Sequence, residues 1–487
     1  MQFMQSKCNK NNKYSIGVSG DQVMIYLPRF VAVAVVGMVF AAIPARFNAY
    51  PSVYPTGTTI YNPDKAWSGY VIYDTIDEQG SMLVDMNGNV VRVLTDLAQA
   101  PGPARILPGG YVMGGDFPRK PHQEAIALVQ FDWDGNEVWR FDRTEQVKTE
   151  DGEMIWAARL HHDWQREGNP VGYYAPDMEP ETDKGRTLIL AHKNVSKPEI
   201  TDKLLEDDYI IEVSWEGEVI WEWLASDHID EFGLTEDARN VIYRAASFNE
   251  ERGSLDWLHI NAMSYLGPNK WYDNGDERFH PENILLSIRR PNIIAIVDRT
   301  GSLVWRLGPD YRQSKELSEI GQMIGQHHPH IIPKGLPGAG NMLVFDNGGE
   351  SGYGWANPSA PDGVRSVRRG FSRVLEINPV TLEKVWEYQI DGPESFRFFS
   401  HYVSNMQRLP NGNTMINEGA GGRLFEVTNE KEIVWEYINP VFGTEVTTRN
   451  SIYRAHRIPY EWIPQLEKPE ERPVVPPNLK DFRMPAQ

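Results

Sequence analysis

Alternating hydrophobic and polar positions recur along the chain in short runs, each introduced by a turn. The recurring unit is a turn, a charged or polar residue, and an apolar strand with a period of two that usually contains Trp. Six copies follow one another, at residues 87–94, 134–141, 216–223, 300–307, 382–388 and 430–437. The first four open with X-Gly, and Asn-Gly or Asp-Gly tolerates the positive φ of a tight hairpin turn. The pattern therefore predicts six similar β-hairpins.

Further apolar runs accompany these copies. Strands directly before five of them are predicted at 127–131, 209–213, 293–297, 373–377 and 423–427, and inner strands at 187–191, 283–287, 341–345 and 413–417. Five copies carry Trp, while the first has Arg92 at that position. We assign the Trp series to packing between repeats.

The spacing of the copies indicates a repeat architecture. Arg92 to Trp139 and Trp386 to Trp435 are each about 48 residues apart, close to one four-stranded propeller blade, whereas the middle steps exceed roughly 80. The predicted fold class is therefore all-β, a six-bladed β-propeller with long inter-strand insertions, preceded by an N-terminal apolar helix. We expect the insertions to hold the functional residues.

The N-terminal segment has the pattern of an export signal. The uncharged run 30–43 follows Lys7, Lys10, Lys13 and Arg29 and leads into small residues. At 14 residues it is short for a membrane span, although residues 23–27 could lengthen it into an anchor. We predict a signal peptide or membrane anchor at 1–48, a catalytic propeller at 49–465 and a Pro-rich tail at 466–487. The protein is then exported, periplasmic or extracellular, or anchored facing outside the cytosol.

Composition narrows the function. The formal charge of −19 argues against nucleic acid as a partner, because phosphate recognition needs a basic face. Cys8 is the one cysteine and precedes the apolar run. This excludes a cysteine nucleophile, an intrachain disulfide and a Cys-ligated metal in the body of the protein. Homo-oligomerisation stays open.

Four segments concentrate histidine, namely 160–164, 256–262, 325–330 and 399–402. Each belongs to a different predicted blade, so inward-pointing imidazoles would converge in a central channel. Neighbours on a strand face opposite sides, so only one of His161 and His162 should enter the channel. Asp163 could orient His162, which favours His162.

Several motifs together resemble one known family. They are His-His-Asp at 161–163, His259-Ile-Asn-Ala, Leu285 to Arg289, Gln326-His327, Leu343 to Gly348, Phe371 to Arg373 and 407–413. The sequence resembles the aryl-sulfate sulfotransferase family of exported six-bladed propellers from about residue 58 to 440. That resemblance implies transfer of a sulfuryl group from an aryl sulfate to a phenol through a sulfohistidine, with no cofactor.

The resemblance also implies roles for particular residues. His327 matches the nucleophile, and His259, Arg289 and His162 match residues that bind and neutralise the sulfonate oxygens. Sulfuryl transfer, like phosphoryl transfer, has a loose transition state, so positioning and cationic donors matter most. We expect further substrate contacts from His161, His328, His330, His401, Arg373 and Asn261.

Two other functions compete. In one, a transition-metal ion (Fe, Cu or Zn) is held by His162, His259, one of His327, His328 or His330, and His401, on a metal-dependent oxidoreductase or lyase. In the other, the propeller is a non-catalytic binding module. Metal-independent turnover of p-nitrophenyl sulfate with phenol, lost in His327→Ala, would distinguish the sulfotransferase from both.

Overall fold

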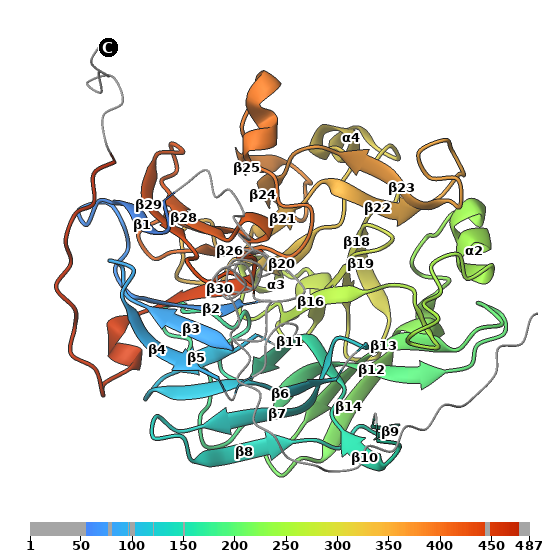
Figure 1. Cartoon of the computed structure of the whole chain (residues 1–487). Coiled ribbons are helices and arrows are strands. Elements are labelled where there is room, and N and C mark those ends of the chain that lie inside the picture. Colours follow the sequence, from blue (N-terminus) through green and yellow to red (C-terminus); the bar gives the residue numbers. More distant parts are fainter. Residues whose placement is uncertain are drawn as a thin grey trace, which may run out of the picture. The chain divides into compact units, whose positions relative to one another are not determined.

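The computed structural model describes residues 55–75, 80–95, 97, 103–119, 121–149, 151–443 and 449–476, which belong to one compact unit at 50–487. The predicted N-terminal apolar helix lies outside the described residues. None of the helices in the described ranges has the length and apolar character to cross a membrane. The described chain is all-β with a β-propeller-like arrangement of antiparallel sheets (Figure 1).

The chain forms successive four-stranded meanders. The first meander consists of β30 (Ile452–Ile458), β2 (Tyr70–Thr75), β3 (Ser81–Val84) and β4 (Val90–Leu94). The second consists of β5 (Arg105–Leu107), β6 (Tyr111–Arg119), β7 (Glu124–Phe131) and β8 (Glu137–Phe141). Next come β11 (Leu160–Arg166), β12 (Thr187–Val195), β13 (Leu205–Val213) and β14 (Val219–Leu224), joined to the β5–β8 meander through the pair of Leu160 with Ala125.

The later meanders repeat this order. They comprise β16 (Ile260–Tyr265), β17 (Ile284–Ile288), β18 (Ile293–Val297) and β19 (Leu303–Leu307); β20 (His327–Ile331), β21 (Met342–Asp346), β24 (Arg373–Ile377) and β25 (Lys384–Tyr388); and β26 (Asn405–Arg408), β27 (Thr414–Glu418), β28 (Arg423–Val427), β29 (Ile433–Ile438) with β1 (Gly57–Tyr61).

The two ends of the domain are joined by strand pairing. β1 pairs with β29, and β30 pairs with β2, so early and late segments share two sheets. Val474, in the predicted tail, adds a bridge to Tyr61. Non-local pairing of this kind closes the arrangement without leaving a free edge at the junction.

Short elements fill the long steps of the repeat. These are β9 (Glu145–Lys148) with β10 (Met154–Ala157), β22 (Gly349–Tyr353) with β23 (Val364–Arg369), β15 (Leu255–Asp256), α2 (Glu236–Tyr243), α3 (Lys270–Asp273) and α4 (Lys315–Ile320), and the 3₁₀ turns η1 (Ala225–His228), η2 (Glu277–Phe279), η3 (Gly392–Arg397), η4 (Gly419–Gly421) and η5 (Tyr460–Trp462). The predicted insertions are therefore present, as hairpins, short α-helices and 3₁₀ turns.

The Trp series of the repeat links neighbouring meanders, as predicted. Each donor, on the outermost strand of its meander, hydrogen-bonds at 2.6–3.1 Å to a turn carbonyl of the next copy, and the last returns to the first. The pairs are Arg92 to Trp133, Trp139 to Trp215, Trp221 to Arg299, Trp305 to Pro379, Trp386 to Asn429 and Trp435 to Met86. We call these six contacts, five from Trp indoles and one from Arg92, the indole ring of contacts, because together they run around the domain and return to the first copy. Arg92 replaces Trp functionally, because its guanidinium donates the bond and lies over the Trp133 ring.

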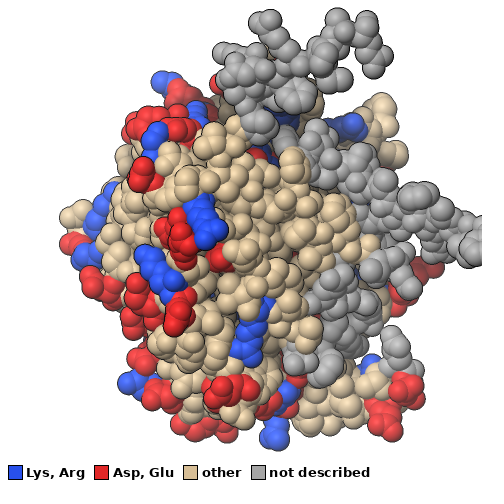
Figure 2. Space-filling model, turned by 60° about the vertical axis from the view of Figure 1, so that its left-hand side comes forward, with Lys and Arg blue, Asp and Glu red and all other residues tan. Residues whose placement is uncertain are grey.

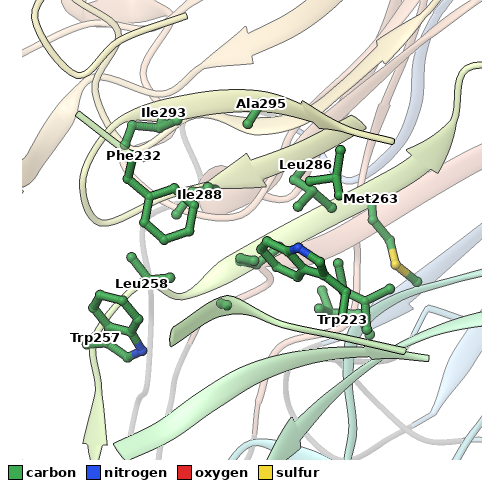
Figure 3. Packing of buried hydrophobic residues seen from close by; sticks show 14 of the residues in the cluster. Trp223, Phe232, Trp257, Leu258, Met263, Leu286, Ile288, Ile293 and Ala295 are labelled. Carbon is green, nitrogen blue, oxygen red and sulfur yellow. The ribbon is translucent and has the colours of Figure 1, made fainter. Parts of the chain in front are cut away.

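Apolar residues pack between adjacent sheets. The largest cluster lies between the β11–β14 and β16–β19 meanders and includes Trp223, Phe232 and Trp257 (Figure 3). Trp257 is fully buried, and its indole donates to Asp207 at 2.8 Å. Because Trp257 precedes His259 by two residues, this core fixes the segment that carries His259.

The innermost strands are β5, β11, β16, β20, β26 and β30, of which β11, β16, β20 and β30 lie near the middle of Figure 1. The runs 187–191, 283–287, 341–345 and 413–417, predicted as inner strands, form the second strands β12, β17, β21 and β27, inside the outer hairpins, whereas the sequence pattern did not show the innermost strands. The true inner strands carry too many polar residues to show an apolar run. Their buried amides instead bond to the backbone of the next inner strand, as Asn405 does to Ala455 at 2.7 Å.

The surface carries charges of both signs. On the face in Figure 2, acidic and basic side chains lie beside one another around a broad uncharged area. Such interspersed charge keeps a large domain soluble without forming a single-sign field on that face.

Candidate active site

The clustered histidines lie on or directly before innermost strands. His161 and His162 are in β11, His327, His328 and His330 are in β20, and His259 immediately precedes β16. The sequence placed these histidines in the insertions or just before inner strands, and only the second of these alternatives holds for them. Polar residues of an innermost strand can face the centre of the domain.

Three of these histidines have left-handed backbone. The φ angles of His162, His259 and His328 are 56°, 55° and 51°. Each lies at or beside an irregularity in strand register, which breaks the normal alternation of side chains. A non-Gly residue in this conformation costs on the order of 1–3 kcal/mol and is found most often at functional sites.

His327 has a fixed tautomer. Its Nδ1 lies 2.7 Å from Asn347 Oδ1 and 3.0 Å from Gly325 O. Asn347 Nδ2 donates to Ser400 O and Val403 O, so the amide oxygen must be the atom that faces His327. Nδ1 therefore carries the proton and Nε2 keeps the lone pair. Burial, and then the charge of Arg289, hold the pKa of His327 well below its usual range, so the imidazole is neutral at pH 7.

Arg289 supplies a cation beside His327. It follows β17 directly, and its guanidinium Nε would lie 3.8 Å from a Cβ placed on Gly325. Burial and the neighbouring Arg290 lower the pKa of Arg289 to about 10, which leaves it charged at neutral pH. None of the described carboxylates forms an ion pair with it. The guanidinium is thus available to an anionic substrate group.

His259 is oriented by Asp256. Its Nδ1 lies 2.7 Å from Asp256 Oδ2, which also pairs with Arg290 at 3.2 Å and Arg252 at 3.4 Å. Burial raises the pKa of Asp256, but the charges of Arg290 and His259 outweigh it and hold the pKa well below the usual range. Burial also lowers the pKa of His259, against the opposing effect of Asp256. Nε2 of His259 remains on the side away from the carboxylate.

His161 and His162 both lie in the buried cluster. Their Nδ1 atoms are 2.8 Å apart, so one donates to the other. The His162 ring packs edge-on against His259, with centroids 4.7 Å apart, whereas His161 stacks on His192 at 3.7 Å. Burial, followed by neighbouring imidazoles, lowers the pKa of both well below the usual range. His162 is thus the member in contact with His259. The prediction that Asp163 orients His162 was wrong, because the Asp163 carboxylate pairs with Arg105 and Arg454.

His328 and His330 belong to a separate group, which we call the inner imidazole cluster together with His456 and Tyr173. The His328 ring lies 4.8 Å from His330 and 5.8 Å from His456 between centroids. His330 Nδ1 donates to His328 O, and Tyr173 Oη lies 2.9 Å from His330 Nε2. The cluster is buried.

The remaining predicted site residues have diverse surroundings. Asn261 donates to Gln326 O at 2.8 Å and so ties β16 to the segment before β20. Arg373 is committed to Asp346 and to Ile320 O, with Nε–Oδ2 and Nη1–O distances of 2.9 Å. His401 is exposed. Partial desolvation of its ring, followed by the positive charges of Arg449 and Arg289, lowers the pKa of His401.

The predicted four-histidine metal site is not supported. His328 lies with His330 and His456, and His401 is exposed. Within the described ranges, His161, His192 and Asp208 bring their ligand atoms within 4.8 Å of one another. However, His161 and His192 stack almost parallel, at an interplanar angle of 15°. In-plane lone pairs of parallel stacked rings do not converge on one ion.

Sequence reasoning missed the residues that orient the histidines. Asp256 and Asn347 set the rings of His259 and His327. Each has only a weak sequence signal. Asp256 is an acidic residue three positions before His259, and Asn347 is an amide at the end of a strand. Tyr453 packs on His162, and Arg454 donates to Asn261 O at 3.1 Å, from a strand far along the chain.

The β22–β23 insertion lies over the Arg289–Arg290 turn. Ser351 Oγ donates to Arg289 O at 3.0 Å, and Tyr353 Oη donates to Trp257 O at 2.7 Å. A cavity of about 60 Å³, open to solvent, lies between this insertion and both arginines. A larger cavity of about 560 Å³ shares Tyr353 and is also lined by Trp355 and Pro291.

The arylsulfotransferase (ASST) family model matches residues 174–454, more than half of the chain. The chain belongs to the arylsulfotransferase family. The region matched by this arylsulfotransferase model contains His259, Arg289 and His327, whereas His161 and His162 precede it. No curated protein sequence matches the chain.

Solved structures with similar backbones are distant in sequence. A protein of unknown function from Bacteroides caccae is 12% identical, with a TM-score of 0.42, covering 80% of this chain and 99% of that chain. The periplasmic gluconolactonase PpgL of Pseudomonas aeruginosa is 10% identical, with a TM-score of 0.36 and coverages of 80% and 99%.

Proposed function

We propose that the protein is an aryl-sulfate sulfotransferase, which transfers a sulfuryl group from an aryl sulfate to a phenol through His327. The observation that carries the proposal is the fixed tautomer of His327, which keeps a lone pair on Nε2, together with the charge of Arg289, which acts on His327 and has no carboxylate partner among the described residues. A buried neutral imidazole is a competent nucleophile, and Arg289 can neutralise the sulfonate oxygens of the incoming ester.

The first half-reaction would form a sulfohistidine. Nε2 of His327 attacks sulfur, the bond from sulfur to the aryl oxygen breaks, and the electron pair leaves with the phenoxide. Binding of the anionic ester favours the imidazolium form of His259, which the ring reaches by taking a proton from water at Nε2 while Asp256 holds the Nδ1 proton. His259 then gives the Nε2 proton to the departing phenoxide.

The second half-reaction reverses these roles. The acceptor phenol gives its proton to Nε2 of His259 as its oxygen attacks sulfur, and the N–S bond to His327 breaks. His162, against the His259 ring, would donate to a sulfonate oxygen. Over one cycle His259 regains its proton and His327 is freed of the sulfuryl group, so the enzyme returns to its starting state. No cofactor takes part.

The larger cavity suits the aromatic part of both substrates. Aromatic rings bind well against Tyr and Trp faces, and Tyr353 and Trp355 line this space next to the cavity at Arg289. We infer that the sulfate ester points toward Arg289 while the ring lies between the β22–β23 insertion and Pro291.

The proposal extends to location and blade number. Export is supported by the charged and apolar pattern of residues 1–48 and is tested by N-terminal sequencing of the protein recovered outside the cytosol. Six blades are supported by the six copies of the repeat and by the indole ring of contacts, which returns to its starting copy.

Turnover of p-nitrophenyl sulfate with phenol tests the reaction. We expect His327→Ala to lower kcat at least about 10³-fold, because the covalent path is lost. His280→Ala is the matched control, since His280 lies in a turn and accepts only a local bond from Glu282 N. Trapping without acceptor should add one sulfuryl group to a His327 peptide. Full activity in His327→Ala would contradict the proposal.

A further inference from the structure

The β22–β23 insertion brings a third arginine to the cavity at Arg289. Arg365, on β23, lines this cavity together with Arg289, Arg290 and Glu350. Its Nη1 donates to Glu350 Oε1 at 3.0 Å. Arg365 is exposed, whereas Arg289 is partly buried. The cavity therefore has one guanidinium at its outer side and another toward the domain.

A β-bulge directs Arg365 to this place. Between two register pairs β22 has one residue, Gly352, whereas β23 has two, Arg365 and Ser366. Arg365 takes a left-handed φ of 58° there. A bulge re-aims a side chain, and the left-handed conformation costs a non-Gly residue on the order of 1–3 kcal/mol. As a result Glu350, whose register partner is Arg368, forms its ion pair with Arg365 instead.

The cavity adjoins the segment that carries His327. A Cβ placed on Gly325 would lie 3.6 Å from Ser351 Cβ and 3.8 Å from Arg289 Nε, and both of these residues line the cavity. Gly325 O in turn lies 3.0 Å from Nδ1 of His327. An anion that enters the cavity thus arrives beside the residues that hold the imidazole.

The charges of the cavity suit a single anion. Arg290 pairs with Asp256, and Arg365 pairs with Glu350. Burial and then Arg290 lower the pKa of Arg289 to about 10, and the charge of Arg365 acts in the same direction. Counted with these carboxylate partners, the three arginines leave one positive charge in excess. A sulfate monoester carries one negative charge, which would balance it.

The ion pair between Arg365 and Glu350 is easily opened. The two side chains are 67% and 47% exposed. A pair so accessible to water contributes about 0–1 kcal/mol, so Arg365 can leave Glu350 at little cost. An anion held between Arg365 and Arg289 would accept charge-assisted hydrogen bonds from both guanidiniums. Glu350 therefore holds Arg365 at the cavity and competes with the incoming anion.

We propose that Arg365 is a substrate-binding residue, which exchanges Glu350 for the sulfate group of the aryl ester and brings that group to Arg289. This inference rests on the proposed sulfuryl transfer and assigns a binding role alone, because no bond forms or breaks at Arg365. Its contact is made when the donor binds and persists through the transfer. Loss of Arg365 should therefore act on KM rather than on kcat.

Kinetics with p-nitrophenyl sulfate at saturating phenol test this role. We expect Arg365→Ala to raise KM for the ester about 10-fold and to change kcat by less than about twofold, because one charge-assisted hydrogen bond is lost. Glu350→Gln should lower KM about two- to threefold, since the competing carboxylate is removed.

Arg368→Ala is the matched control. It removes the same charge from an exposed position on the same strand, and Arg368 does not line the cavity. KM should stay at the wild-type value in this variant. An equal rise in KM in Arg365→Ala and Arg368→Ala, or a fall in kcat without a rise in KM, would overturn the inference.

Binding to an inert variant separates this inference from the proposed reaction. In a His327→Ala background, Arg365→Ala should raise the dissociation constant of p-nitrophenyl sulfate about 10-fold by titration calorimetry, while Arg368→Ala leaves it unchanged. If the wild-type protein did not turn over the ester, the proposed reaction would fail, and this difference in binding would still support Arg365 as an anion contact. Equal dissociation constants in the two variants would refute the role of Arg365, whether or not turnover is observed.

Discussion

At the scale of single residues, Asn347 decides which nitrogen of His327 can react. Its amide is locked by two backbone carbonyls, so its oxygen accepts the Nδ1 proton of His327. Asp256 plays the matching part for His259. Both resemble the second-layer groups that fix a histidine tautomer in other enzymes.

Asn347→Leu should lower kcat about 10–100-fold with little change in KM for p-nitrophenyl sulfate, because the tautomer is lost while Arg289 is kept. Gly325 O still accepts from Nδ1, which limits the loss. Asn405→Leu is the matched control, since Asn405 is an equally buried amide that bridges β26 to β30. Equal losses in both variants would show that Asn347 acts only through stability.

At the scale of elements, the indole ring of contacts joins each meander to the next. Its members differ in exposure, since Trp435 is fully buried and the bond from Trp386 lies at the surface. A buried donor excludes water from its acceptor, so its removal leaves a carbonyl without a partner.

We expect Trp435→Phe to lower the free energy of unfolding by roughly 2–4 kcal/mol, through a cavity and an unsatisfied Met86 carbonyl. Trp386→Phe should cost roughly 1 kcal/mol or less, because water can replace the indole. Urea unfolding of both variants measures the difference. Equal costs would argue against a role for burial in the Trp435 contact.

At the scale of the whole molecule, buried neutral histidine makes stability depend on pH. Six buried imidazoles and the partly buried His259 have lowered pKa values; the six are His161, His162, His327, His328, His330 and His456. In the unfolded chain each binds a proton below about pH 6.5. The folded state does not, so stability is full above that pH and declines below it.

Four buried carboxyls act in the opposite sense. Burial raises the pKa of Asp74 to about 7, that of Asp207 to about 6, that of Asp208 well above its usual range and that of Glu418 above its usual value. These groups bind protons in the folded state first, so they add stability as the pH falls. These carboxyls are fewer than the imidazoles, so the net effect of lowering the pH is a loss of folding stability.

Urea unfolding at pH 7.5, 6 and 5 should therefore show a falling free energy of unfolding. The slope should be about 1.4 kcal/mol per pH unit for each net proton taken up on unfolding. His330→Gln should reduce the slope, since burial lowers the pKa of His330 to about 4 and the variant removes that proton. A flat profile between pH 7.5 and 5 would contradict neutral imidazoles in the folded protein.

The sequence by itself determined the all-β class, the repeat and the family, because hairpin turns and period-two strands are local features. It also identified His259, Arg289 and His327 as a group, since their motifs survive in linear order. The outer strands and the Trp contacts followed from the same local pattern.

The tertiary structure decided what depends on groups distant in the chain. Left-handed backbone at His162 breaks the alternation on which the choice between His161 and His162 rested. The tautomer of His327 comes from Asn347, which is itself fixed by Ser400 and Val403. The pairing of both Arg105 and Arg454 with Asp163 forms only when β5, β11 and β30 meet around that carboxylate, because such pairing is a property of the folded interior.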